Sequence, residues 1–333
     1  MPPYPSISVV LPTYNCRPLL VRHLPAMREW LDLAYEVVVV DSRSTDGTLE
    51  LIRAEIRHPR LRIIERDRGL YASWNEAIAA TTGAWVYIST AGDTIARAQL
   101  LHLLEVGESL AADVVVSPPA FVHEDGRPHR DLGWPPAKLL QEFGRGQPFV
   151  MHPEATQYLA FLHCPSALLG SSASNLYRGP HLRARPFPTE YGTVGDTAWI
   201  MRFSHETRLA LTPRRGSSFC IHEKESQPGP EQSLELYRRL LKGEQERLAA
   251  QGLRLTPMMA AHFGAPSLAD RVQELRAEKR LLWRAPNNRL SNKLRWVATT
   301  CRYLWWRAEA GRNRRDALAQ LRFEAQWFRH LPD

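Results

Sequence analysis

The sequence predicts an α/β protein with a Rossmann-like, mixed but mainly parallel sheet and helices on both of its faces. From Ile7 to Ser117, short apolar runs rich in β-branched residues alternate with segments of helical spacing. This alternation is typical of parallel strands joined by crossover helices. Hydrophobic residues make up 44% of the chain and charged residues 23%, a composition that supplies enough apolar side chains for a large core.

Two kinds of pattern place the elements of this fold. Strands are expected at the short β-branched runs Ile7–Leu11, Glu36–Asp41, Leu61–Glu65, Trp85–Ile88 and Asp113–Ser117. Helices are expected where apolar residues recur every three or four positions, at Arg17–Leu33, Thr48–Ile56, Tyr71–Thr81 and Arg97–Leu110.

The remainder of the chain is less regular. Residues 118–153 are rich in Pro, Gly and charged residues, so long loops with short elements are expected there. A charged helix is expected over Gln232–Gln251, either covering the sheet or forming a homodimer contact. Two further helical stretches are expected at Pro266–Trp283 and Asn288–Arg329. The predicted domains are residues 1–225, with halves at 1–117 and 118–225, and a helical extension over residues 226–333.

The positive charge lies in the tail. The formal net charge is +8, yet residues 271–333 alone hold 15 basic and 6 acidic residues, so residues 1–270 carry a net charge of −1. A body that wrapped nucleic acid would itself be basic. In the tail, aromatic residues such as Trp305 and Trp306 are interleaved with arginines, which suits the headgroup layer of an anionic membrane. Packing against protein explains the same pattern. Nucleic acid is the least supported partner, because no stacking platform accompanies the charge.

Cysteine usage and the chain start suggest a cellular location. The four cysteines, Cys16, Cys164, Cys220 and Cys301, are far apart and form no CxxC pair, so neither a zinc site nor a disulfide framework is indicated. No run of about 18 apolar residues occurs, and the Met-Pro-Pro-Tyr-Pro start lacks the basic region of a signal peptide. We therefore expect a cytoplasmic protein, peripheral on the inner face of the cytoplasmic membrane if the tail binds lipid.

Polar residues follow three of the predicted strands, at Pro12–Asn15, Asp41–Asp46 and Thr90–Asp93. The carboxyl ends of parallel strands share one edge of the sheet, which is where ligands bind, so these segments should meet. The sequence contains no GxGxxG after the first strand and no GxxxxGK[ST], which makes dinucleotide and P-loop interpretations weak. An acid at the second strand end can accept hydrogen bonds from a ribose or a base, and Asp93 is placed to hold a divalent cation on a diphosphate.

These segments resemble the nucleotide-sugar half of family 2 glycosyltransferases, which have the GT-A fold. The matching pieces come in the family's order: Val9–Asn15 (VVLPTYN), Val37–Thr48 (VVVVDSRSTDGT), Arg66–Ile78 (RDRGLYASWNEAI), Thr82–Asp93 (TGAWVYISTAGD), Val194–Trp199 (VGDTAW) and Phe219–Ser226 (FCIHEKES). The second and third pieces are the most specific. The likeness is strongest to the branch whose acidic motif reads Asn-Ala-Gly-Asp, which serves cell-surface polysaccharide synthesis.

The resemblance implies a nucleotide-sugar site formed by Pro12, Thr13, Tyr14, Asn15, Asp41, Asp46, Arg68, Gly69, Asn75 and Gly92. Within it, Asp41 contacts the uracil or its ribose, Asp46 fixes the adjoining loop, and Asn75 caps or contacts the site. Asp93 and His222 are implied as ligands of Mn²⁺ or Mg²⁺ and the diphosphate, and Asp196 as the catalytic base. Taken singly, these residues also fit plainer roles as turn, cap or core residues.

The chain departs from the family's pattern at several positions. Thr90 stands where relatives usually have Asp or Asn, and Gly92 stands where relatives often have a second Asp. Only Asp93 therefore remains of the acidic motif. Gly195 replaces the usual Glu before the base, and Ala72 replaces an Asp at the start of its helix.

The predicted activity is inverting transfer of a sugar from a nucleotide-sugar donor, UDP-linked, to a hydroxyl of a surface glycan or a lipid-linked acceptor. Asp196 would accept the proton of that hydroxyl without a covalent intermediate. Two alternatives stay open. The loss of all but one acid from the acidic motif favours an inactive GT-A module that binds a nucleotide sugar or acts as a scaffold for a polysaccharide assembly complex. The basic tail favours an adaptor protein that binds the membrane surface.

Overall fold

The computed structural model describes residues 4–164, 166–221, 230–253, 268–284, 290–323 and 328–331. The chain forms two compact units, one of Met1–Lys224 with Phe328–Asp333 and one of Glu225–Trp327. The first unit contains the sheets, whereas the described part of the second is helical.

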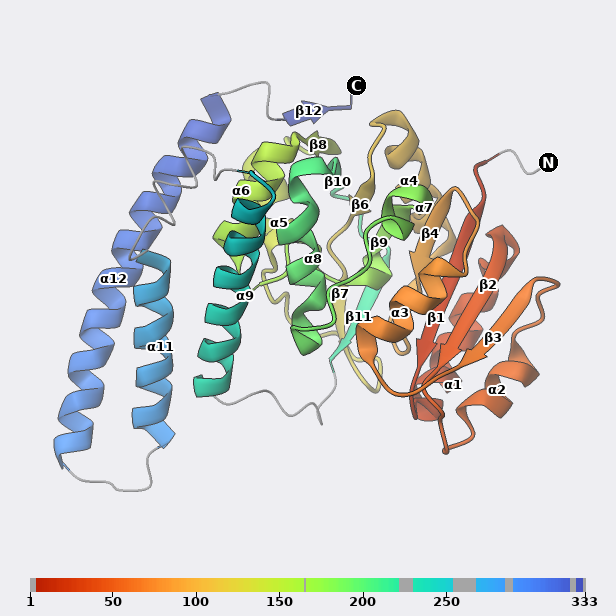
Figure 1. Ribbon diagram of the computed structural model, residues 1–333, viewed down its shortest axis with the longest axis horizontal. Helices are drawn as coiled ribbons and strands as arrows, with labels where there is room; N and C mark the ends of the chain where they lie inside the picture. Colours follow the sequence, from red (N-terminus) through yellow and green to blue (C-terminus); the bar gives the residue numbers. More distant parts are fainter. Residues whose placement is uncertain are drawn as a thin grey trace. The chain divides into compact units, whose positions relative to one another are not determined.

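A nine-stranded sheet runs through the first unit in the order β12-β8-β10-β6-β9-β4-β1-β2-β3 (Figure 1). The strands are β1 (Ile7–Thr13), β2 (Ala34–Asp41), β3 (Leu61–Glu65), β4 (Trp85–Ile88), β6 (Val114–Val116), β8 (Phe149–Met151), β9 (Asn175–Arg178), β10 (Leu209–Leu211) and β12 (Phe328–His330).

The half of the sheet from β4 to β3 is parallel, as the sequence predicts. β1 and β2 stay in register from the pair Ser8 and Glu36 to the pair Thr13 and Asp41. Both strands are almost wholly buried, which is typical of parallel strands covered on two faces. The shared register brings the ends of β1 and β2 out side by side.

The other half of the sheet is mixed, as expected for a mixed, mainly parallel sheet. β9 lies between β4 and β6 and is antiparallel to both. β10 is parallel to β6 but antiparallel to β8. The four residues of β9 follow a polar, serine-rich segment, so hydrophobic periodicity does not reveal this strand.

Helices cover both faces of the sheet. α1 (Arg17–Arg28), α2 (Thr48–Glu55) and α4 (Arg97–Ser109) share one core with the face that carries Val9 and Leu11. α3 (Leu70–Ala79) contacts β1 and β2 and lies across them in Figure 1. The remaining helices of this unit are α5 (Pro135–Phe143), α6 (Pro153–His163), α7 (Gly179–Arg183) and α8 (Gly195–Phe203), with single 3₁₀ turns at Leu31–Leu33, Ser172–Ser174, Gly192–Val194 and Ser204–Glu206.

A second sheet has three strands in the order β5-β11-β7. They are β5 (Thr94–Ile95), β11 (Ser217–Ile221) and β7 (Ala120–His123). β5 begins directly after Asp93, so this small sheet anchors the turn that carries Asp93.

The chain end returns to the first unit as strand β12, which pairs antiparallel with β8. Phe328 stacks on Phe143 with ring centroids 4.3 Å apart and meets Phe149 edge-on at 5.6 Å. Leu331 N–H donates to Pro148 O over 3.0 Å. The helix expected to run to Arg329 therefore ends earlier: described helix stops at Phe323, and Arg329 lies in a strand.

The second unit contains α9 (Pro230–Ala250), α11 (Leu268–Arg284) and α12 (Leu290–Phe323). α11 and α12 pack along each other, and Arg302 of α12 pairs with Glu278 of α11. Among the described helices, none combines the length and the apolar character needed to cross a bilayer. The four cysteines are free thiols, three of them buried and Cys301 exposed.

Candidate functional site

The site begins where β1 and β2 end, at Thr13 and Asp41. The Thr13 hydroxyl donates to Asp41 Oδ1 over 2.7 Å. Ser44 adds two donors to the same carboxylate, its backbone N–H to Oδ2 at 2.7 Å and its hydroxyl to Oδ1 at 2.6 Å. Asp41 is fully buried, so it forms the floor of the strand-end site, and its contact with a nucleotide stays a prediction.

Asp46 orders the loop beside that floor. Its carboxylate accepts from the backbone N–H of Arg17 at 3.1 Å, and from the backbone N–H and hydroxyl of Thr48 at 3.1 and 2.6 Å. Hydrogen bonding to the ionised form lowers the pKa of Asp46 against the opposing effect of burial, which is the largest single influence. Asn15 completes the loop, because its amide oxygen accepts from Thr45 N–H at 2.8 Å. These contacts hold the loop between β2 and α2, and a part for Asp46 in a nucleotide-sugar site stays a prediction.

Tyr14 and Arg68 form the exposed part of the site. Tyr14 is 41% exposed, and the Arg68 guanidinium carbon lies 4.4 Å from its ring centroid. Pro12 is half-buried at the end of β1, and Gly69 immediately precedes α3. A cation held on an aromatic ring at the carboxyl edge of the sheet is suited to an anionic, ring-bearing ligand.

Asn75 holds a neighbouring segment instead of facing solvent. Its amide nitrogen donates to Phe187 O at 2.8 Å, and its amide oxygen accepts from Phe187 N–H at 2.7 Å. This pair of bonds ties α3 to the chain before Asp196. The structure thus gives Asn75 a positioning contact, while a direct contact with a nucleotide stays a prediction.

Asp93 ends a tight turn after β4 and is 5% exposed. Its Oδ1 accepts from Cys220 N–H on β11 at 2.8 Å, and its Oδ2 accepts from the hydroxyls of Thr90 and Ser171 at 2.8 and 3.3 Å. Gly92 has φ of 94°, a left-handed conformation that favours glycine. An Asp in place of Gly92 would strain this turn, which gives a physical reason for the missing second acid.

His23 on α1 holds the Asp93 turn through two hydrogen bonds of its ring. Its Nδ1–H donates to Asp93 O at 2.6 Å, and its Nε2 accepts from the Ser89 hydroxyl at 2.9 Å, a tautomer fixed because a carbonyl oxygen only accepts. Burial lowers the pKa of His23 to about 4, so the ring is neutral at pH 7. His23 was not predicted. The signal that identifies it is a titratable residue at a core-facing position of an amphipathic helix.

Asp196 lies in the first turn of α8 and is half-buried. Its Oδ1 accepts from Thr197 N–H at 2.7 Å. Burial raises the pKa of Asp196, while hydrogen bonds from Thr197 and the Tyr71 hydroxyl act in the opposite direction. A carboxylate with a raised pKa is a better proton acceptor than an ordinary one, which is the property that a general base needs.

Tyr71 links Asp196 to α3, the helix that contacts β1 and β2. Its hydroxyl also lies 3.2 Å from Thr193 O, and its ring stacks on Phe187 at 5.5 Å. A Cβ built on Gly195 would lie 2.4 Å from the Tyr71 ring and 2.5 Å from Pro188 O. The family's Glu therefore has no room at Gly195, because Tyr71 fills that place.

A divalent cation at this place would have few protein ligands. Within the described residues, no three His, Cys, Asp or Glu side chains are grouped to hold a metal ion. His222, the other expected ligand, lies outside the described residues. Asp93 alone fits a cation held chiefly by diphosphate oxygens and water, since Mg²⁺ commonly binds one or two carboxylates together with substrate phosphates.

An aromatic cluster lies beside the Asp93 turn. Trp134 meets Phe121 and Phe219 at ring-centroid distances of 4.8 and 4.9 Å. The Trp134 ring also covers Gly170, the residue before Ser171, because a Cβ built there would lie 3.5 Å from it. Ser171 in turn donates to Asp93. The chain of contacts therefore connects the half-buried ring of Trp134 to Asp93.

The structure thus joins the predicted residues into two groups. Thr13, Asn15, Asp41 and Asp46 form one hydrogen-bonded loop system. Asp93 belongs to a second group that includes residues the sequence does not reveal, namely His23, Ser171 and the Cys220 amide. These partners are 70 to 127 positions away from Asp93 in sequence, so no local pattern connects them.

Comparison with known proteins finds similarity to one family over the first half of the chain. Residues 8–164 match the family model described as glycosyl transferase family 2. The succinoglycan biosynthesis protein ExoO of Rhizobium meliloti is 32% identical over 125 residues, 37% of this chain and 36% of that protein. A PGL/p-HBAD biosynthesis glycosyltransferase of Mycobacterium tuberculosis is 31% identical over 118 residues, 33% of this chain and 45% of that protein. The chain thus matches less than half the length of these curated relatives.

Solved structures share the fold over almost the whole chain. S. aureus TarS 1–349 in complex with UDP superposes with a TM-score of 0.52 and 20% identity, covering 95% of this chain and 91% of that one. The mannosyltransferase PcManGT from Pyrobaculum calidifontis, in complex with GDP-Man and Mn²⁺, gives a TM-score of 0.54 and 18% identity, covering 97% and 88%. These likenesses confirm the predicted fold class, a GT-A fold with a helical C-terminal region.

Proposed function

We propose that this chain, whose residues 8–164 match the glycosyl transferase family 2 model, transfers a sugar, with inversion, from a nucleotide-sugar donor to an acceptor hydroxyl. The observation that carries the proposal is the arrangement at the carboxyl edge of the parallel sheet. There an ordered acidic floor at Asp41, a cation on an aromatic ring at Tyr14, and the buried turn of Asp93 lie at the ends of three strands. This edge is where parallel α/β sheets bind ligands.

The donor is a nucleoside diphosphate sugar, UDP-linked. Tyr14 and Arg68 would contact the nucleotide, and the guanidinium would offset the charge of the diphosphate. A bound divalent cation would supply further charge compensation to the leaving diphosphate, with Asp93 as its protein ligand. Two solved structures of the same fold are complexes with UDP and with GDP-Man and Mn²⁺, which supports this class of donor.

The catalytic base is Asp196. It would accept the proton of the acceptor hydroxyl as the oxygen attacks the anomeric carbon from the side opposite the diphosphate. Its burial favours proton uptake, and Tyr71 and the Thr197 amide orient the carboxylate. One such displacement inverts the anomeric centre and needs no covalent enzyme intermediate.

The acceptor is a growing surface glycan or a lipid-linked saccharide. Relatives named for succinoglycan and PGL/p-HBAD biosynthesis support an acceptor of this class. Trp134 and Phe219 would stack on the acceptor ring, since they are half-buried and their cluster adjoins the Asp93 turn. Aromatic faces suit the apolar side of a sugar ring.

The helical unit would hold the protein at an anionic membrane surface. On α12, the exposed residues Leu294, Val297, Cys301, Leu304 and Trp305 recur at helical spacing and form one apolar stripe. Lys293 and Arg302 lie on either flank of it by helical register. An apolar stripe with basic flanks is the pattern of a helix that lies in the lipid headgroup layer.

The alternative proposal is an inactive GT-A module that binds a nucleotide sugar or scaffolds an assembly. It is favoured by one observation, the single carboxylate in the acidic motif. Activity on a donor separates the two proposals, whereas donor binding alone does not.

Donor binding is tested by thermal unfolding with a panel of nucleoside diphosphates, with and without Mn²⁺. A ligand at about 100 times its dissociation constant adds about 2.7 kcal/mol of stability. We expect one nucleotide to raise the melting temperature of the native chain in a metal-dependent way and to lose this effect in Asp93→Asn. Asp125→Asn, at an exposed carboxylate paired with Arg127, is the matched control. No shift with any nucleotide would overturn the proposal.

A further inference from the structure

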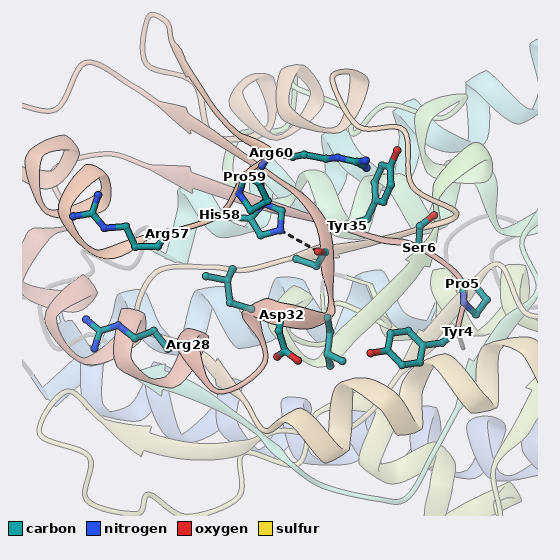
Figure 2. Close-up of a pocket in the computed structure, with 13 residues that line it drawn as sticks. Tyr4, Pro5, Ser6, Arg28, Asp32, Tyr35, Arg57, His58, Pro59 and Arg60 are labelled. Carbon is teal, nitrogen blue, oxygen red and sulfur yellow. Dashed lines mark hydrogen bonds between the residues drawn. The ribbon is translucent and has the colours of Figure 1, made fainter. Parts of the chain in front are cut away.

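A cavity of about 710 Å³ opens at the edge of the sheet opposite the strand-end site. It lies between Tyr4–Ser6, Arg28–Tyr35 and Arg57–Arg60, next to the first residues of β1 and β2 (Figure 2). Seven residue steps along β2 separate Ala34 at this cavity from Asp41, about 23 Å at about 3.3 Å per residue. A ligand bound here therefore cannot reach the reacting atoms at the other edge.

Arginines dominate the charge of this cavity. Arg28, Arg57 and Arg60 line it, and Asp32 is the one carboxylate among the lining residues. Asp32 is bound by Arg97 from outside the cavity, and Arg28 by Glu55. Within the described part of the chain, the guanidinium groups of Arg57 and Arg60 form no salt bridge. The cavity thus presents two cations that are not neutralised by a carboxylate.

The turn that carries these two arginines is fixed in place by His58. Its Nε2–H donates to Ala34 O over 3.0 Å, and its Nδ1 accepts from Arg60 N–H over 3.1 Å. Pro59 restricts the turn further. Among the residues that the structure describes, the Arg57 guanidinium donates only to the carbonyl of Arg53, at 3.5 Å, so its other N–H groups are available to a ligand. The binding groups are therefore held in position before any ligand arrives.

The floor and the far end of the cavity suit a ring. Leu31, Leu33 and Ala34 are buried and apolar beneath it. Figure 2 shows Arg28 and Arg57 at one end of the cavity and the rings of Tyr4 and Tyr35 at the other, with Arg60 extended toward Tyr35. The Arg60 guanidinium carbon lies 4.0 Å from the Tyr35 ring centroid. A ligand that spans the cavity would place an anionic group at Arg57 and a polar ring at the end formed by Arg60 and Tyr4.

We propose that this cavity binds an acidic sugar, a saccharide unit that carries a carboxylate or a phosphate group. The anionic group binds Arg57 at one end of the cavity, and the sugar ring lies over the apolar floor with its hydroxyls toward the Arg60 guanidinium and Tyr4. The volume accommodates one to two sugar rings, within the range of about 300–1,000 Å³ that ligand pockets occupy. The site is distinct from the donor site, and the inference does not depend on the proposed transfer reaction, because binding here involves neither donor nor base.

Calorimetric titration of the full chain tests the proposal with glucuronate, glucose 1-phosphate, inorganic phosphate and glucose as probes. We expect glucuronate or glucose 1-phosphate to bind and glucose to bind at least tenfold more weakly. Arg57→Ala and Arg60→Ala should each weaken the acidic probe about tenfold, the loss typical of one charge-assisted hydrogen bond. Arg53→Ala, at the same end of α2 but outside the cavity, is the matched control and should bind like the native chain.

The two acidic probes separate the sources of the anionic group, since preference for glucuronate indicates a carboxylate and preference for glucose 1-phosphate a phosphate. Inorganic phosphate binding as tightly as glucose 1-phosphate would contradict a sugar site. Equal binding by the native chain and both cavity variants, or no binding of either acidic sugar, would overturn the proposal. Both arginines are exposed, so the variants should keep the native melting temperature, and the nucleotide-induced thermal shift should stay intact.

Discussion

The imidazole of His23 stays uncharged at neutral pH because it is buried between Ser89 and the backbone of Asp93. Its pKa of about 4 in the folded protein lies below the ordinary value of 6.5. Between these two values the unfolded chain binds a proton and the folded chain does not. The stabilising contribution is therefore present above pH 6.5 and is lost as the pH falls toward 4.

We predict that His23→Gln removes this pH dependence. In the native chain the His23 contribution to the free energy of unfolding should fall by about 2 kcal/mol between pH 7 and pH 5. Urea unfolding of both proteins at the two pH values measures the difference. The same pH slope in the variant and the native chain would show that His23 is not the titrating group.

Trp134 is predicted to act on the acceptor and not on the donor. Its ring adjoins Gly170, the residue before Ser171, but contacts neither Tyr14 nor Asp41 in the described structure. Trp134→Ala should raise the KM for the acceptor about tenfold, since a stacked aromatic contributes about 1–3 kcal/mol, and should leave the KM for the donor unchanged. Steady-state kinetics with each substrate varied in turn makes the comparison. A change in the donor KM alone would place Trp134 elsewhere in the mechanism.

At the scale of elements, strand β12 ties the chain end to the main sheet. Phe328 packs on Phe143 and Phe149, and the His330 ring bonds to Phe143 O at 2.6 Å. The strand covers β8, which would otherwise be an unpaired edge. Residues 328–331 therefore contribute to the stability of the sheet unit, although they follow the helical unit in sequence.

Removing the Phe328 ring should destabilise the sheet unit. Phe328 is half-buried, so Phe328→Ala is expected to lower the free energy of unfolding by about 2 kcal/mol and to speed hydrogen exchange at Phe149–Met151. Leu294→Ala, at an exposed apolar residue of α12, is the control and should change stability by less than about 0.5 kcal/mol. Unchanged exchange in β8 would mean that β12 does not pair there in solution.

The sequence predicts correctly those elements whose own residues carry a clear pattern of apolar and polar side chains. β1, β2, β3 and β4 are apolar, β-branched runs, and polar residues at their ends place Thr13, Asp41 and Asp93 at one edge. β9 and β12 have three or four residues each and gain their stability from strands far away in sequence, so periodicity does not reveal them. Ser171 and the Cys220 amide are hidden for the same reason, because only the tertiary fold brings them to Asp93.

At the scale of the whole molecule, the chain joins a sheet unit that carries the site to a helical unit with an exposed apolar stripe. Deleting the residues after Arg271 would test the role of the tail, but it would also remove β12 and so damage the sheet unit. Point substitutions on α12 are the better test, because they leave both units complete.

The membrane proposal predicts that Leu304→Asp with Trp305→Asp lowers binding to vesicles of anionic lipid at least tenfold. Each of these side chains would bury apolar surface worth about 1.5–3 kcal/mol. Cosedimentation with phosphatidylglycerol vesicles and with neutral phosphatidylcholine vesicles measures the bound fraction. Equal binding of native and variant chains, or equal binding to both lipids, would contradict a membrane role for the stripe.

The central claim, that this chain is a glycosyltransferase with Asp196 as its base, is tested most directly by the release of nucleoside diphosphate from a panel of nucleotide sugars. We expect the native chain to release one nucleotide and Asp196→Asn to do so at least 100-fold more slowly. The variant should bind that nucleotide like the native chain and unfold no more easily, since burial raises the pKa of Asp196 and disfavours its charge. Release at the native rate by Asp196→Asn, or no release from any donor by the native chain, would contradict the account.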